Sequence, residues 1–362
     1  TAGAILSLIV GAENKQVSRK LLFQRISKIV YFLMKVQNRD GIYPAYLDGR
    51  KGLPEYRSGM ASYDVQATSS LIEALLIARE YFNSDQDEER DLRSRITSLY
   101  DQINWEAIVN AQGLLKPRFG LVDTELSNRL TIPLNGANEA INTYLLAISS
   151  SKHALPTSSY FEGVYNNFGM RRVAQIEELE ADVYSDSLSN DEGASMLLHR
   201  PFTDSLSRSS ILKPSIKYAV DLPFGEYTGS LMELYKPFLT INPTLLKDSV
   251  VNWAETVNAY VKYVKRSDNE RGVGVSASDI WGFYQHKDSI GNYRINPAIG
   301  PSALIADQNV GVAAALALYQ KYGDVLFTEY GFRSWLDLRN NDVSDEYLAM
   351  NQSAIVVALE NA

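Results

Sequence analysis

A helical hydrophobic period that returns in long blocks is the feature that most limits how this chain can fold. In each block, apolar residues recur at spacings of three and four, which places them on one face of a helix. The blocks lie at residues 5–9, 21–33, 71–81, 92–103, 141–148, 245–264, 310–322 and 352–359. Segments that alternate with a period of two are scarce, so the pattern predicts an all-α protein.

Short polar segments separate the helical blocks. Ser18 stands where it could cap the second helix, and turn signals occur at Asp40-Gly41, Asp48-Gly49 and Gly291-Asn292. Loops on a rigid helical scaffold are where function usually lies. Residues 181–210 differ from the rest because they are rich in Ser, Asp and Asn and show no sustained period. We expect them to form an inserted loop or lid beside the mouth of the site.

Composition narrows the class of protein. The 362 residues are 45% hydrophobic and 22% charged, which suits a globular protein with a sizeable core, and one large domain over residues 1–362 is admissible. The net charge of -8 argues against a nucleic-acid partner, which would need a basic surface. The longest apolar run, residues 4–10, is too short to cross a bilayer, so we expect no integral membrane segment.

Several kinds of chemistry find no support in the sequence. There is no Cys, and His153, His199 and His286 are far apart without the spacing of a metal site, so neither metal nor cofactor is expected. The chain also lacks a glycine-rich phosphate loop and a nucleophile elbow. Carboxylates and aromatic side chains remain, and glycoside hydrolysis needs two carboxylates while sugar rings stack on aromatic faces.

Two acids lie where a loop meets a helix. Glu139 follows Asn135-Gly136-Ala137-Asn138 at the start of a predicted helix, where the helix dipole would favour its ionised form. Asp64, in Ser62-Tyr63-Asp64, could likewise be a helix cap. Either residue could simply stabilise the first helical turn, and either could be catalytic.

Several motifs, taken in their order along the chain, resemble the bacterial glucoamylase-like family, which includes inverting endo-β-1,2-glucanases. They lie at residues 40–48, 71–82, 138–140, 276–279, 329–332 and 347–352. The resemblance runs from Thr1 to Ala362 apart from residues 181–210. It implies an (α/α)6 toroid of paired helices around a central cleft, and it makes Glu139 of the Asn-Glu motif a catalytic candidate.

The sequence departs from the family pattern at positions that matter for catalysis. Ala67 stands where the family usually has an acid, and Asn351 replaces an Asp. Glu226, by contrast, is an acid where the family usually has Gln. An amide cannot serve as general acid or base, and such catalysis is worth about 10²–10⁴-fold. The departures therefore leave open a protein that kept the fold and lost the chemistry.

The resemblance implies a glycoside hydrolase acting on a glucan or related oligosaccharide by inverting acid–base catalysis. Glu139 would be the acid, with a base or anchor among three other acids and with several residues that contact sugar. The candidate bases are Asp64, Asp279 and Glu226, and the candidate sugar contacts are Tyr43, Tyr46, Asp48, Trp281, Asn351 and Gln352. The aromatic residues could equally serve in packing between helices.

The alternative function is a carbohydrate-binding protein without catalysis. A toroidal polysaccharide lyase would need a Tyr or His base and a basic pocket, and its loop signatures are not found.

The expected partner of either a hydrolase or a binding protein is an oligosaccharide or polysaccharide. We expect a monomer, and the resemblance implies a periplasmic or extracellular bacterial protein whose export signal would be removed or lie outside this sequence.

Overall fold

The computed structural model describes residues 1–55, 62–120, 133–165, 214–226, 230–270, 279–283 and 294–362. Helices dominate these residues, and the strands among them are two or three residues long. The prediction of an all-α fold is therefore confirmed. The Gly291-Asn292 turn and the lid expected at residues 181–210 lie outside the described residues.

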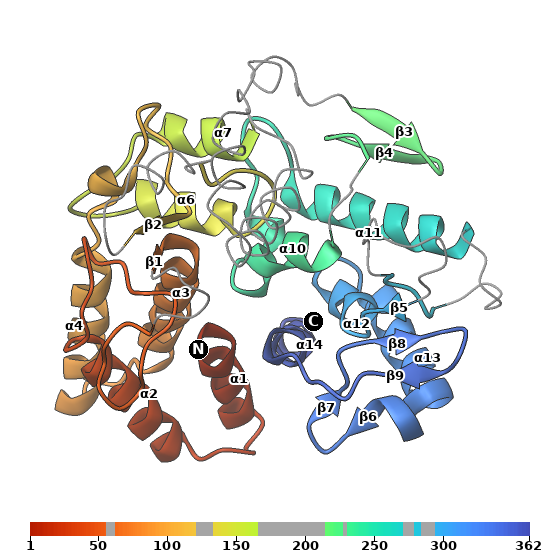
Figure 1. The fold of residues 1–362 in the computed structure, drawn as a ribbon, viewed down its shortest axis with the longest axis horizontal. Coiled ribbons are helices and arrows are strands. Elements are labelled where there is room, and N and C mark those ends of the chain that lie inside the picture. Colours follow the sequence, from red (N-terminus) through yellow and green to blue (C-terminus); the bar gives the residue numbers. More distant parts are fainter. Residues whose placement is uncertain (56–61, 121–132, 166–213, 227–229, 271–278, 284–293) are drawn as a thin grey trace, which may run out of the picture.

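The helices form two concentric layers around the centre of the molecule (Figure 1). The inner layer contains α1 (Ala2–Glu13), α3 (Val65–Tyr81), α6 (Ala140–Ile148), α10 (Leu231–Tyr235), α12 (Ile299–Ser302) and α14 (Ala349–Glu360). The outer layer contains α2 (Arg19–Leu33), α4 (Asp87–Asp101), α7 (Thr157–Tyr165), α11 (Trp253–Glu270) and α13 (Gln308–Leu326). The chain alternates between the layers, which is the arrangement of a toroid built from helix pairs.

The inner helices close into a ring. Helix α3 packs between α1 and α6, and α14 packs between α12 and α1. Asn14 at the end of α1 donates a hydrogen bond to Glu360 at the end of α14 (Nδ2–Oε2, 2.8 Å), so these two helices run in the same direction. On the opposite side, Asn142 of α6 donates to the carbonyl of Pro237, just after α10 (3.2 Å). The first and last helices thus lie side by side (Figure 1).

Short helical and extended segments fill the connections. The 3-10 helices are η1 (Trp105–Ile108), η3 (Lys236–Leu239), η4 (Pro243–Leu245) and η5 (Ala303–Ile305). Antiparallel pairs join β1 (Ser62–Asp64) to β2 (Arg118–Gly120), β3 (Ser215–Lys217) to β4 (Val220–Leu222), and β6 (Phe327–Thr328) to β7 (Gly331–Phe332). In a small three-stranded sheet, β8 (Leu336–Asp337) pairs with β5 (Arg294–Ile295) and β9 (Asp342–Val343). None of these strands forms a layer of its own.

Local sequence signals position the helix ends. Ser18 caps α2 as predicted, because its hydroxyl accepts from the backbone N–H of Leu21 (3.2 Å). Asp64 caps α3 in the same way by accepting from Ala67 (2.8 Å). The predicted turn at Asp40-Gly41 has positive φ at both residues, 55° and 81°. Such caps fix where each helix starts, and therefore which residues reach the ring's interior.

The helix predicted at residues 245–264 begins later than expected, at Trp253. The preceding segment is a turn in which Asp248 Oδ1 accepts from the backbone N–H groups of Val250 and Val251 (2.8 and 3.0 Å). The apolar residues of this turn have the spacing of a helix by chance, which is why the predicted start was too early. Helices α7, α10 and α12 were not predicted; α10 and α12 have only five and four residues, which is too short for a period to show.

An ion pair between the outer helices α2 and α4 allows a test of what holds neighbouring helices together. Glu89 of α4 is 3% exposed and bonds both to the Arg19 guanidinium of α2 and to the backbone N–H of Ser84 (3.0 Å). The hydrogen bond from Arg19 holds the pKa of Glu89 at about 2, against an ordinary 4.5. This stabilisation is complete above about pH 4.5 and disappears as the pH falls toward 2.

We expect Glu89→Gln to lower the free energy of unfolding at pH 7 by about 1 to 3 kcal/mol, because Arg19 loses its charged partner. The difference from the wild type should shrink between pH 4.5 and 2. Urea unfolding at several pH values measures it, with the exposed Asp87→Asn on the same helix as control. A difference that did not change with pH would contradict this account.

Candidate active site

Glu139 is the N-cap of α6, and a tight turn delivers it there. Gly136 has φ of 95°, which a residue with a side chain rarely adopts, and its N–H bonds to the carbonyl of Gly163 (3.2 Å). Asn138 then accepts from the backbone N–H of Ala140 through Oδ1 (2.8 Å). The expectation that Glu139 starts a helix is confirmed.

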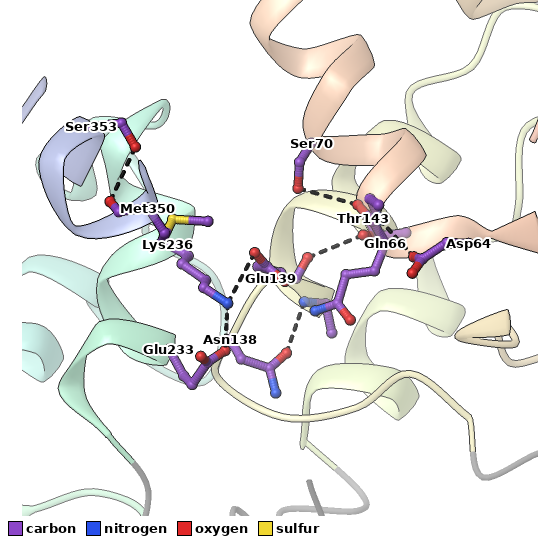
Figure 2. Close-up of polar contacts among 12 residues, drawn as sticks. Asp64, Gln66, Ser70, Asn138, Glu139, Thr143, Glu233, Lys236, Met350 and Ser353 are labelled. Atoms are coloured by element: carbon purple, nitrogen blue, oxygen red, sulfur yellow. Dashed lines mark hydrogen bonds and ion pairs between the residues drawn. The ribbon is translucent and has the colours of Figure 1, made fainter. Parts of the chain in front are cut away.

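The side chains around Glu139 come from several inner elements (Figure 2). Asp64, Gln66 and Ser70 belong to the start of α3, while Glu233 and Lys236 belong to α10 and the turn that follows it. Asn138 and Thr143 flank Glu139 at the start of α6, and Met350 and Ser353 belong to the first turns of α14. The N-terminal ends of α3, α6 and α14 and the C-terminal end of α10 therefore meet at this region of the ring.

Lys236 joins two carboxylates at the site. Its Nζ lies 3.3 Å from Oε1 of Glu139 and 3.0 Å from Oε2 of Glu233 (Figure 2). The Glu139 and Lys236 side chains are 19% and 18% exposed, and that of Glu233 is 38% exposed. The cluster is thus enclosed by protein while still reaching solvent, as a site for a small ligand requires.

Burial controls the charge of Glu139. Desolvation raises the pKa of its carboxyl, Glu233 and Asp64 raise it further, and Lys236 opposes them without reversing the shift. We expected the helix dipole to favour the ionised form of Glu139, but the pKa of this carboxyl is raised, with desolvation as the largest cause. Burial also lowers the pKa of Lys236, but Glu139 and Glu233 outweigh burial and hold it above its ordinary value.

Glu73 is a second acid with a displaced pKa, and the sequence reading missed it. It lies on α3, and Asn142 of α6 donates to its Oε1 (Nδ2–Oε1, 2.6 Å) and to Thr240 Oγ1 (3.0 Å). Desolvation raises the pKa of Glu73 to about 7, with a contribution from the charge of Glu139. The available signal was a single acid inside the otherwise apolar run of residues 71–78.

Of the three candidate bases, Asp64 is the one among the main causes of the raised pKa of Glu139. Besides capping α3, it accepts from Arg118 Nε (3.0 Å). Asp279 and Glu226 are about half exposed, and each is paired with a lysine at 2.7 and 2.5 Å, respectively. The choice among the three stays a prediction, with Asp64 best supported.

The predicted sugar contacts divide into buried and exposed residues. Trp281 is fully buried and Tyr43 is 3% exposed with its hydroxyl donating to the carbonyl of Leu33 (3.2 Å). These two rings have the packing role that the sequence left open, and no face is exposed for a sugar. Tyr46 is 49% exposed and remains a candidate platform, and Asp48 bonds to the backbone of its own loop.

The C-terminal amides have structural partners. Asn351 is 4% exposed, and its side chain exchanges hydrogen bonds with that of Asn296 (3.1 and 3.4 Å). Gln352 accepts from the backbone N–H of Phe332 and donates to its carbonyl (3.1 and 2.6 Å). Both amides therefore hold the start of α14, which makes them poor sugar contacts. Ala67, in contrast, is exposed on the first turn of α3.

Metal binding finds no support in the part of the chain that the structure describes. There, no group of three or more His, Asp or Glu side chains could hold an ion. His153 faces Glu106 at 3.9 Å, whereas His199 and His286 lie outside the described residues. No described helix is long and apolar enough to cross a membrane.

Known proteins resemble this chain over nearly its whole length. An exo β-1,2-glucooligosaccharide sophorohydrolase of Parabacteroides distasonis is 25% identical over 99% of this chain and 48% of its own length. The chain therefore spans about half the length of that curated relative. No established family profile matches.

Several solved structures share its fold. They include a β-1,2-glucanase of P. distasonis (TM-score 0.80, 23% identity) and an endo-β-1,2-glucanase of Chitinophaga pinensis in complex with sophorotriose and glucose (0.78, 23%). A candidate glucoamylase of Bacteroides uniformis gives 0.78 at 22%. Each match covers 99% of this chain and, in the same order, 50%, 80% and 81% of the other.

The resemblance to the glucoamylase-like family is confirmed. At these identities the solved structures establish the fold of this chain. It is the helical toroid found in these proteins, two of which are β-1,2-glucanases.

The displaced pKa of Glu73 predicts a pH-dependent stability. A carboxyl whose folded pKa is raised from 4.5 to about 7 costs stability as the pH rises through that interval. We expect Glu73→Gln to be more stable than the wild type above pH 7 by up to about 3 kcal/mol, and equal to it below about pH 4.5. Thermal unfolding across this range measures the effect. The exposed Glu80→Gln on the same helix should show no such trend.

Proposed function

We propose that this protein is a glycoside hydrolase that acts on a β-1,2-linked glucan or oligosaccharide, with Glu139 as the general acid. The single observation that carries the proposal is a buried carboxyl with a raised pKa at the meeting point of the inner helices. Burial keeps such a carboxyl protonated to higher pH, so it can give a proton to the leaving oxygen. The names of the relatives support the substrate class.

In the proposed reaction, Glu139 protonates the glycosidic oxygen as the bond to the anomeric carbon breaks. A second carboxylate takes a proton from water on the opposite face of the sugar, and the water oxygen bonds to that carbon with inversion. Asp64 is our preferred base. This mechanism needs about 6.5–9.5 Å between the two carboxyl groups, the gap that accommodates the water.

The two departures from the family pattern carry different weight in this proposal. Asn351 is engaged with Asn296 inside the protein, so its amide does not stand where a base would meet water. Ala67 is exposed at the start of α3, close to Asp64 in the chain, and it leaves that position without an acid. In the proposed reaction, Asp64 serves in its place. We further expect a monomer in the periplasm or outside the cell, as the resemblance implies.

We expect Glu139→Gln to lower the rate of hydrolysis about a hundredfold or more while leaving oligosaccharide binding largely intact. The amide keeps the shape of the side chain but has no acidic proton. Release of reducing sugar from β-1,2-glucan measures hydrolysis, and calorimetric titration with short oligosaccharides measures binding. Glu106→Gln, which alters an exposed acid on η1, is the matched control.

The wild type decides between the two functions that the sequence left open. Release of reducing sugar, with the inverted anomer seen first by proton NMR, is the outcome expected of the hydrolase. Binding of an oligosaccharide without any release from a panel of β- and α-glucans would instead identify a carbohydrate-binding protein.

A further inference from the structure

Lys236 and Glu233 form, with Glu139, a cluster of two carboxylates around one ammonium. We propose that Lys236 and Glu233 are positioning residues for Glu139: Glu233 holds the Lys236 ammonium and balances its charge, which leaves Glu139 to carry the catalytic proton. The proposal rests on the proposed role of Glu139 as acid. Neither residue was singled out from the sequence.

Charge balance inside the cluster is the first argument. With both carboxyls ionised, one ammonium faces two negative charges, and the cluster carries one net negative charge in a largely buried place. Uptake of one proton makes the cluster neutral, which burial favours because desolvation penalises net charge. If Lys236 faced only one carboxyl group, the pair would be neutral when that carboxyl was ionised. Burial would then favour the ionised carboxylate, which has no proton to give.

Geometry indicates which carboxyl takes the proton. Glu233 lies nearer to the ammonium than Glu139 does (3.0 against 3.3 Å), and its side chain is twice as exposed (38% against 19%). Greater distance from the ammonium and lower exposure to water both favour the protonated form at Glu139. Glu139 is the better-buried carboxyl and is therefore the one that carries the proton.

The pair is held on a segment tied to Glu139's own helix. Ser230 caps α10 by accepting from Met232, and Pro237 follows Lys236 directly. The Pro237 carbonyl accepts from Asn142 on α6, the helix whose N-cap is Glu139. This link fixes Lys236 relative to Glu139, as a positioning role requires.

Glu233 is engaged by an ammonium. The Lys236 Nζ lies 3.0 Å from Glu233 Oε2 and 3.3 Å from Glu139 Oε1. An inverting reaction needs a base that holds a water. A positioning role fits this geometry, and Asp64 stays the preferred base.

Other charged groups also act on Glu139 and must stay constant in a test. Asp64, the N-cap of α3, is paired with Arg118 of β2 and raises the pKa of Glu139. Glu73, also of α3, is coupled to Glu139, since the charge of Glu139 raises the pKa of Glu73. Changes at Lys236 and Glu233 leave both acids in place.

Two substitutions should move the protonation of Glu139 in opposite directions. Glu233→Gln removes a negative charge and leaves Lys236 to Glu139 alone, so the alkaline limb of the kcat/KM profile should move down by about half a pH unit or more. Lys236→Met removes the positive charge, so the limb should move up by about one pH unit or more. Loss of a merely structural contact would lower activity without opposite shifts.

A second measurement separates this proposal from the proposed function. Carbon-13 NMR of carboxyl-labelled Glu, with the Glu139 signal assigned by its absence in Glu139→Gln, follows the titration of Glu139 without any substrate. The same opposite shifts are expected there. The exposed Asp87→Asn and Lys28→Met on the outer helices should cause none.

Equal or absent shifts in the NMR titration would overturn the positioning role even in an active hydrolase. Opposite shifts in a protein that hydrolyses nothing would support the positioning role and reject the hydrolase. Circular dichroism checks folding of each variant. If Lys236→Met does not fold, Glu233→Gln decides alone. In that variant the titration of Glu139 should move to lower pH, and a titration that stays in place or moves to higher pH contradicts the proposal.

Discussion

Contact between the first and last inner helices is the constraint on which the rest of the structure depends. Helices α1 and α14 are separated by almost the entire chain, yet they pack together and are tied at their ends by Asn14 and Glu360. A ring closed in this way fixes the position of every inner helix relative to its neighbours. The helix starts that meet near Glu139 therefore form a rigid frame, as preorganised catalysis requires.

The frame explains how one region collects so many charged side chains without a metal ligand set among the described residues. Helix starts bring capping acids such as Asp64, because an N-cap needs an acceptor for free N–H groups. The inner position of the same helices then desolvates those acids. Lys236 compensates part of this cost, and the remaining net charge favours one proton on Glu139.

Burial and hydrogen bonding also show which of the residues that the sequence singled out are part of the packing and not of the site. An amide at position 351 suggested a lost catalytic acid, but Asn351 is paired with Asn296 below the surface. Trp281 suggested a sugar platform and is instead part of the core. Conversely, no sequence pattern indicated Glu73 or Lys236, yet both interact electrostatically with Glu139.

The sequence by itself determined the helical blocks, the caps at Ser18 and Asp64, and the place of Glu139 at a helix start, because each depends on residues a few positions apart. The toroid and the family came from motifs in their order along the chain, and the comparisons confirmed them.

Only the tertiary structure decided the raised pKa of Glu139, the partners of Lys236 and the burial of Trp281. These properties come from groups about a hundred residues apart that packing brings together. Desolvation and charge pairing depend on distance in space, and no local pattern in the sequence records that distance.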